Sequence, residues 1–232
     1  MKSMKSMKIQ KTLLHDSVEV AQVTEEETLY TAEELQEQFP RAFGRAFDQW
    51  LRNATDYGWW ESEYDYFEEV GKTLGFEFSH RPACNMNGEA IRGEVELFFS
   101  LDRDRDLTFG GSYTYRPGSL AAIKKNFPDK DLVRLAADLQ ELQRKNRYGM
   151  RMSLSSYHRY GYGQRVLVYD ANGREASGDL EEAAVELVKG FRYWMLRRLE
   201  ETCEHLTSVE TFLEECGANG HLFLETGEEF YL

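Results

Sequence analysis

The sequence has few cysteines and no long apolar run, and both shortages limit the kind of protein it encodes. Its 232 residues include three cysteines, an odd and sparse count that is typical of reduced thiols in a cytoplasm. No window approaches the roughly 18 consecutive apolar residues that a membrane span needs. The basic start, MKSMKSMKIQ, is not followed by an apolar segment and so does not predict a signal peptide. We therefore expect a cytoplasmic protein.

Familiar catalytic motifs are missing as well. There is no Gly-x-Ser-x-Gly elbow, no phosphate-binding loop and no paired-histidine zinc helix. Cys84 with His80 nearby is a weak nucleophile signal, because both fall in an expected loop. We therefore expect no enzymatic activity.

Metal-ligand chemistry is present, but its spacing does not indicate a metal site. Asp102, Asp104 and Asp106 resemble the start of a calcium loop, yet Leu107 and Tyr113 stand where its glycine and bidentate glutamate belong. A solvated hairpin tip is the simpler interpretation. Four further residues could ligate zinc: Cys203, His205, Cys216 and His221. The first two are two positions apart on an expected helix and face different directions, so we expect no metal and no cofactor.

The composition is that of a folded protein with an acidic surface. Apolar residues make up 41% and aromatic residues 13% of the chain, which is enough for a sizeable core. The net charge is −13, from 41 acidic and 28 basic residues. This excess argues against general binding to the phosphate backbone of nucleic acids and favours either plain solubility or a basic partner.

Two β-hairpins are predicted from runs rich in aromatic and β-favouring residues. The first joins 95–101 to 107–115 across the charged tip DRDRD, and the second joins 150–157 to 164–169. Further strands are expected near 9–23, at 76–79 and in the tail HLFLETGEEFYL, whereas the polar segment 80–93 is expected to be a loop.

Helices are predicted from apolar periodicity and capping signals. Capping boxes are expected at Thr31 with Glu34 and at Asp179 with Glu182, and Thr207 followed by Glu210 predicts a further helix start. Pro40 predicts a break in the first helix, and glycine predicts the ends of the helices near 59–74 and 207–217. A short helical turn is expected at 120–125, a helix capped by Asp129 after it, and a long helix from 179 to about 206.

These elements predict an α+β fold, in which an antiparallel sheet of two hairpins is packed by N-terminal, central and long C-terminal helices. We expect a partly flexible N-terminal segment over 1–30 and a single domain over 31–232.

The order of four segments resembles a family of uncharacterised phage and prophage proteins, often labelled antitoxin of a toxin–antitoxin stability system. The segments are Leu29 and Tyr30 followed by TAEEL, WWESEYDYFEEVGKTLGFEF, FFSLDRDRDLTFGGSYTY and NGHLFLETGEEF. The family loop usually bears glycine and tryptophan, where this chain has DRDRD. The resemblance implies a phage or prophage origin, action inside a bacterial host cell, and no particular chemistry.

Acidic residues are concentrated in two places. From 201 to 232 there are eight glutamates and no lysine or arginine. On the helix near 59–74, Glu61, Asp65 and Glu69 recur every four residues and rise about 6 Å per step, as regularly spaced anions that could imitate the phosphates of DNA. Six residues are therefore candidates for binding a basic partner: Glu61, Asp65, Glu69, Glu210, Glu214 and Glu215. The alternative is an acidic surface that only aids solubility.

The segment 144–165 is the opposite case, because it is basic, rich in tyrosine and free of acids. Such a mixture suits single-stranded nucleic acid, and the candidate residues are Arg144, Lys145, Arg147, Arg151, Arg159 and Arg165. The favoured interpretation is that these cations pair with the protein's own carboxylates. The leading hypothesis is thus a non-enzymatic, phage-encoded inhibitor that binds a bacterial defence or toxin protein, for example a CRISPR effector, through an acidic face that mimics nucleic acid. The alternative is a nucleic-acid-binding regulator or antitoxin.

Overall fold

The chain folds as two compact units in a computed structural model that describes residues 6–10, 24–55, 58–87, 89–102, 105–157 and 163–230. The central unit comprises Trp59–Thr202, and the terminal unit combines Met1–Gly58 with Cys203–Leu232. This division corrects the prediction of a single domain over 31–232, because each unit has its own apolar cluster. The segment 1–30, predicted to be partly flexible, lies in large part outside the described residues.

The central unit is built on a four-stranded antiparallel sheet. Its strand order is β10 (Gly163–Tyr169), β9 (Arg151–Tyr157), β8 (Gly111–Thr114) and β3 (Phe76–Phe78). The register places Tyr113 opposite Phe76 on one side and Met152 on the other. All three side chains are buried, so this row fixes which face of the sheet meets the core.

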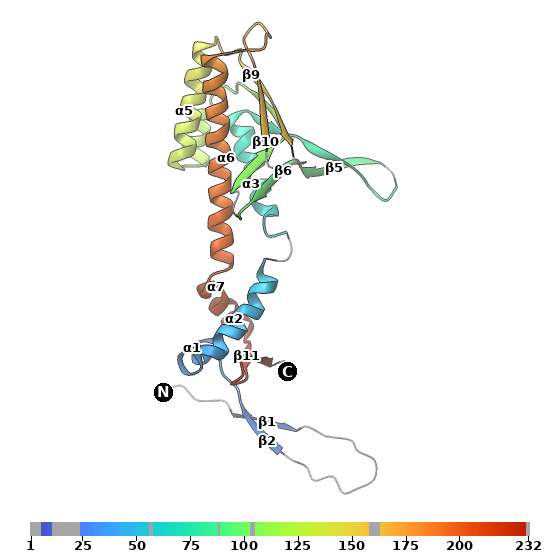
Figure 1. Cartoon of the computed structure of the whole chain (residues 1–232), viewed down its shortest axis with the longest axis vertical. Helices are drawn as coiled ribbons and strands as arrows, with labels where there is room; N and C mark the ends of the chain where they lie inside the picture. The colour runs from blue at the N-terminus through green and yellow to red at the C-terminus, as the bar shows by residue number, and fades with distance from the viewer. Residues whose placement is uncertain are drawn as a thin grey trace. The chain divides into compact units, whose positions relative to one another are not determined.

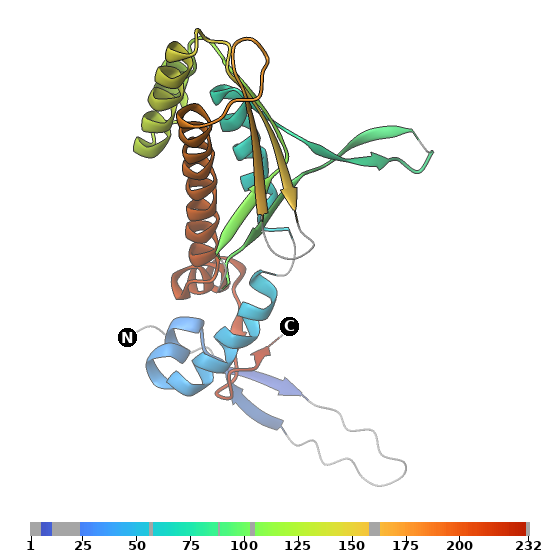
Figure 2. The same ribbon diagram turned by 45° about the horizontal axis from the view of Figure 1, so that its top comes forward.

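Two further hairpins extend the central unit. One pairs β6 (Leu97–Ser100) with β7 (Asp106–Phe109), and the other pairs β4 (His80–Cys84) with β5 (Ala90–Val95). The β4–β5 hairpin projects away from the four-stranded sheet (Figure 2). The prediction of a loop over 80–93 is therefore wrong, while the hairpin across 150–169 is confirmed.

The first predicted hairpin is correct at its tip but ends earlier than expected. The chain bends at Gly110, and β8 leaves the hairpin to pair with β3 and β9. A Cβ on Gly111 would lie 2.3 Å from the carbonyl oxygen of Glu77, so only glycine fits at this crossing. The side chain of Gln164 bridges the break, since its amide donates to the Phe109 carbonyl and accepts from the Phe109 N–H, both at 2.9 Å.

Four helices complete the central unit: α3 (Glu61–Leu74), α4 (Ser119–Asn126), α5 (Lys130–Lys145) and the part of α6 (Asp179–Leu206) up to Thr202. α5 and α6 lie side by side on one side of the sheet (Figures 1 and 2). Phe191 of α6 stacks on Phe76 at 4.9 Å and on Trp194 at 6.0 Å in the centre of the core. This α+β arrangement confirms the predicted fold class.

Helices α3 and α6 are also joined by an ion pair whose carboxylate is buried. Glu63 is only 7% exposed, and its carboxylate accepts from Arg198 Nε at 2.5 Å and from Thr202 Oγ1 at 2.9 Å. The Arg198 guanidinium lies 4.3 Å above the Tyr66 ring. These contacts hold the start of α3 against α6.

The terminal unit joins segments from both halves of the chain. It contains β1 (Ser6–Gln10), β2 (Thr24–Thr28), α1 (Ala32–Gln38), α2 (Pro40–Ala54), α7 (Val209–Asn219), β11 (Leu222–Phe223) and β12 (Glu229–Phe230). Tyr30 forms a bridge with Phe223 through two backbone hydrogen bonds of 2.9 and 2.8 Å. Phe43 and Phe212 meet edge to face at 5.6 Å in its core.

Local signals located most helix ends correctly. The Thr31–Glu34 capping box, the break at Pro40, the left-handed Gly75 and the Asp129 cap are all confirmed. The long helix predicted from 179 to about 206 is confirmed, although Asp179 is its first residue rather than its cap. Two predicted boundaries of α7 are wrong: Ser208 rather than Thr207 caps it, and it continues past Gly217 to Asn219.

Candidate functional site

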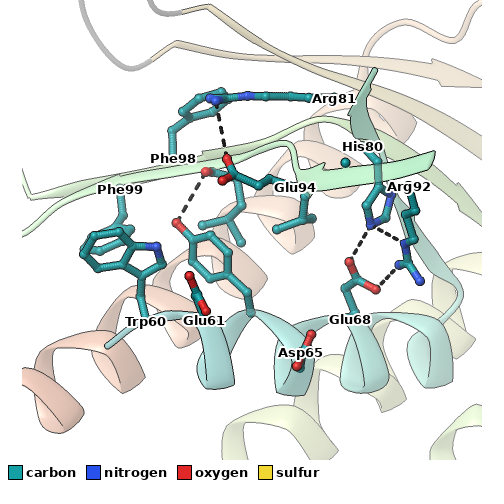
Figure 3. Close-up of a pocket in the computed structure, with 14 residues that line it drawn as sticks. Trp60, Glu61, Asp65, Glu68, His80, Arg81, Arg92, Glu94, Phe98 and Phe99 are labelled. Carbon is teal, nitrogen blue, oxygen red and sulfur yellow. Dashed lines mark hydrogen bonds and ion pairs between the residues drawn. The ribbon is translucent and has the colours of Figure 1, made fainter. Parts of the chain in front are cut away.

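A cavity of about 740 Å³ opens in the central unit between α3 and the strands β4, β5 and β6 (Figure 3). Its floor comes from α3, which supplies Glu61, Tyr64, Asp65 and Glu68. We call this cavity the α3 groove. Four carboxylates and two guanidinium groups line it, so the groove has an excess of negative charge when its histidine is neutral.

One end of the α3 groove holds a cluster of three charged or titratable side chains. Glu68 Oε1 lies 2.7 Å from His80 Nε2, Arg92 Nε lies 2.8 Å from the same nitrogen, and Arg92 also pairs with the second oxygen of Glu68. A single imidazole nitrogen cannot donate and accept at once. Because an ionised carboxylate only accepts, Nε2–H is assigned as the donor to Glu68, and Arg92 is held by the carboxylate.

Strand β4 contributes His80 to this cluster, at a point where its pairing with β5 is irregular. The register between β4 and β5 shifts between His80 and Pro82, and such bulges re-aim side chains. The neighbouring Arg81 lies 4.6 Å over the Phe98 ring and 3.7 Å from Glu94, with both charged groups well exposed.

The other end of the α3 groove is aromatic. Phe99 meets Trp60 at 5.9 Å and Tyr64 at 6.3 Å, in both cases edge to face. The Tyr64 hydroxyl donates to the Leu97 carbonyl at 3.4 Å. Burial raises the pKa of Tyr64 far above its ordinary value, so this hydroxyl stays neutral and acts as a hydrogen-bonding group.

Between the two ends stand the predicted residues Glu61 and Asp65. Both are exposed, and neither forms an ion pair or a side-chain hydrogen bond with any residue that the structure describes. Glu69 is exposed but does not line the groove. Each four-residue step advances about 40° around a helix, so Glu69 is turned away from the first member of the row.

The other predicted acidic residues belong to the terminal unit. Glu210, Glu214 and Glu215 are exposed on α7, and Glu215 Oε2 accepts from Trp50 Nε1 at 3.0 Å. A second cavity of about 430 Å³ lies there, where His221 Nδ1 is 2.9 Å from Glu229 Oε1. The structure thus assigns three of the six candidate residues to each unit.

The predicted basic residues are mostly exposed and mostly not neutralised. Arg144, Arg147 and Arg151 form no ion pair with the described residues, whereas Lys145 pairs with Glu141 at 3.0 Å. Among the described residues, Arg147 and Arg151 therefore do not show the favoured pairing with the protein's own carboxylates, whereas Arg144 interacts electrostatically with Glu141. Of the remaining two predicted residues, Arg165 is exposed and takes part in a polar, ring or electrostatic interaction, and Arg159 lies outside the described residues.

The hairpin tip and the zinc candidates do not form a metal site within the described ranges. No three His, Cys, Asp or Glu side chains there could hold a metal ion together. Asp106 is not simply solvated, because it pairs with Arg192 of α6, while Asp104 lies outside the described residues. No helix in the described part of the chain is long and apolar enough to cross a membrane.

Sequence reasoning found two of the four carboxylates of the α3 groove, Glu61 and Asp65, but missed Glu68, Glu94 and the opposite wall. His80, Arg81 and Arg92 fall in the segment that was predicted to be a loop. The available signal was weak: Ile91 and Val95 are the apolar members of an alternating pattern in β5, with a glycine between them.

Comparison with known proteins places the α3 groove within a defined sequence family. No curated protein and no solved structure matched the chain. Residues 59–209 match DUF8835, described as a domain of unknown function. The match coincides closely with the central unit and covers more than half of the sequence. The chain therefore belongs to the DUF8835 family.

Proposed function

We propose that this protein is a non-enzymatic inhibitor that binds a positively charged segment of another protein in the α3 groove. The single observation that carries the proposal is the position of Glu61 and Asp65, two exposed carboxylates without partners among the described residues, beside an aromatic wall. A lysine or arginine side chain gains both from a carboxylate and from the face of an aromatic ring. The resemblance to phage and prophage proteins makes a bacterial defence or toxin protein, such as a CRISPR effector, the proposed class of partner.

The charge distribution supports this role at longer range. Residues 59–202 contain 21 Lys and Arg against 24 Asp and Glu, whereas the two segments of the terminal unit together contain 7 against 17. Most of the negative charge therefore belongs to the terminal unit, including Glu210, Glu214 and Glu215. Such a field increases the rate at which a basic partner is captured, while the α3 groove supplies the specific contacts.

The proposal is tested by neutralising the groove without changing its shape. The variant Glu61→Gln/Asp65→Asn should lose most of its affinity for a labelled oligo-arginine peptide and should recover less partner protein from bacterial lysate. Glu69→Gln is the matched control, because it removes one charge from the same helix outside the groove. Each exposed charge pair contributes up to about 1 kcal/mol, so the loss of two such pairs should weaken binding by up to about 30-fold.

The same set of variants separates groove binding from general mimicry of nucleic acid. If a regular row of anions were the determinant, Glu69→Gln would weaken binding as much as either groove substitution. Equal binding by the wild type and the double variant would refute the proposal. The triple variant Glu210→Gln/Glu214→Gln/Glu215→Gln should lower the association rate at low salt and leave the dissociation rate unchanged.

A further inference from the structure

One face of the four-stranded sheet is not covered by the core. Tyr113, Met152 and Val168 occupy one row across β8, β9 and β10, and all are buried. Side chains alternate between the two faces of a strand. The next row, Thr114 and Arg151 with Tyr169, therefore points to the opposite face, and the first two of these are exposed.

The uncovered face carries positive charge, hydroxyl groups and an aromatic ring. We call it the open sheet face, and its members on the three strands are Ser112, Thr114, Arg151, Ser153, Ser155, Arg165, Leu167 and Tyr169. Glu77 is the one acid among its paired strand positions, at the β3 edge. The central row consists of Ser112, Ser153 and Leu167, so two of the three side chains between the arginines are small.

The segment that joins α5 to β9 carries Arg147 and Tyr148, and Arg144 stands in the last turn of α5. Arg147 and Tyr148 both have left-handed backbone angles, with φ of 53° and 58°, which bulky residues rarely adopt. Buried Gln143 holds the turn. Its side-chain amide hydrogen-bonds both the N–H and the carbonyl of Met150, and its backbone carbonyl accepts from the Tyr148 N–H at 2.7 Å. Tyr148 precedes Arg151, the first residue of β9, by three positions in the chain, so the turn leads directly into the sheet.

The ring of Tyr148 is held at the surface by this arrangement. It is 46% exposed and stacks on Tyr115 with the ring centres 4.7 Å apart. Strained backbone that presents an exposed ring is a feature of binding sites. Arg144 and Arg147 precede the ring in sequence, and both are exposed. Neither forms an ion pair with a described residue, although Arg144 lies near enough to Glu141 to stabilise its charge.

We propose that the open sheet face and the Arg147–Tyr148 turn bind single-stranded nucleic acid. Guanidinium groups satisfy the phosphates, and the rings of Tyr148 and Tyr169 offer surfaces on which bases stack. Sheet faces that bear aromatic residues recognise splayed bases in this way. A duplex keeps its bases stacked inside and uses only the charge, so the tyrosines favour a single strand. The acids near this end are Asp170, whose carboxylate is hydrogen-bonded by its own turn, Glu175, and Glu141, which pairs with Lys145 and is also attracted by Arg144.

The near balance of charge in the central unit makes this binding compatible with a net charge of −13, since most of the excess acid belongs to the terminal unit. The site shares no residue with the α3 groove. Failure of one proposal therefore leaves the other standing.

Binding is measured on the full chain by fluorescence anisotropy with a labelled oligothymidylate of roughly 16 nucleotides, within the usual span of single-stranded sites. The wild type should bind the single strand more tightly than a duplex of equal length. The variant Arg151→Gln/Arg165→Gln should reduce the slope of log affinity against log salt by about 1.4, because each phosphate contact on a single strand contributes about 0.7. Arg134→Gln/Lys189→Gln, on exposed helix positions of the same unit, should leave the slope unchanged.

The stacking contribution is tested by a second pair of variants. Tyr148→Ala should weaken binding by about 5- to 150-fold, whereas Tyr193→Ala, which removes a 67% exposed tyrosine from α6, should have no effect. Tyr148→Phe should retain binding. The proposal is overturned if the wild type fails to bind the single strand at low salt, if duplex or a polyglutamate peptide binds as tightly, or if both alanine variants behave alike.

Discussion

Replacing Glu63 should destabilise the central unit far more than replacing any other carboxylate on α3. The Glu63 side chain is 9% exposed, whereas its partner Arg198 is 41% exposed. Removing one partner of a fully buried ion pair costs about 3–5 kcal/mol, but the exposed guanidinium regains water. We therefore expect Glu63→Ala to lower the free energy of unfolding by about 2–3 kcal/mol. Glu63→Gln, which keeps an acceptor for Thr202 Oγ1, should cost about half as much.

The measurement is equilibrium unfolding in urea, followed by tryptophan fluorescence in a Trp50→Phe background. Trp50 belongs to the terminal unit, so the remaining three tryptophans then report on the central unit alone. Glu69→Ala is the matched control, because it removes an exposed carboxylate from the same helix and should change stability by less than about 0.5 kcal/mol. A loss of less than about 0.5 kcal/mol for Glu63→Ala would refute the view that this ion pair anchors the groove helix.

The remaining predictions concern backbone fit and titration. Gly111→Ala should cost more than about 2 kcal/mol in urea unfolding, because its Cβ would lie 2.3 Å from a β3 carbonyl oxygen, while Gly190→Ala in α6, where the nearest atom is 3.9 Å away, should stabilise the unit by about 0.5–1 kcal/mol. Burial raises the pKa of Tyr113 from 10.0 to about 12, so the stability that it contributes below pH 10 is lost between pH 10 and 12. Tyr113→Phe should remove this slope of up to about 1.4 kcal/mol per pH unit, as measured by urea unfolding across that range; an unchanged slope would contradict it. Burial likewise raises the pKa of the Cys216 thiol to about 12, so iodoacetamide should alkylate exposed Cys84 much faster than Cys216 in the native protein, as mass spectrometry would show; equal rates would argue against the buried position.

Local chemistry made much of the fold predictable from the sequence. A cap such as Thr31 with Glu34, or a left-handed end such as Gly75, depends on residues within one or two turns, so its signal is complete in a short window. The same holds for the hairpin across 150–169, whose strands are neighbours in the chain. These features were predicted at nearly their observed positions.

Other features could not be predicted because they depend on contacts between distant residues. The hairpin β4–β5 has little apolar alternation and reads as a polar loop. The transfer of β8 from one hairpin to a different sheet requires the close approach of Gly111 to β3, which no local pattern reveals. For the same reason Glu61 and Asp65 were identified from their helix, whereas His80 and Arg92 were not.

The terminal unit is assembled from two segments at opposite ends of the chain, and this affects the order in which the protein can fold. Its first segment, Met1–Gly58, has no complete core until Phe212 and Phe223 arrive from the other end of the chain. On a ribosome, the whole central unit emerges between these two segments and can fold first. Until Phe212 and Phe223 emerge, the apolar residues of α1 and α2 that pack against them lack these partners, and exposed apolar surface of this kind favours aggregation during synthesis.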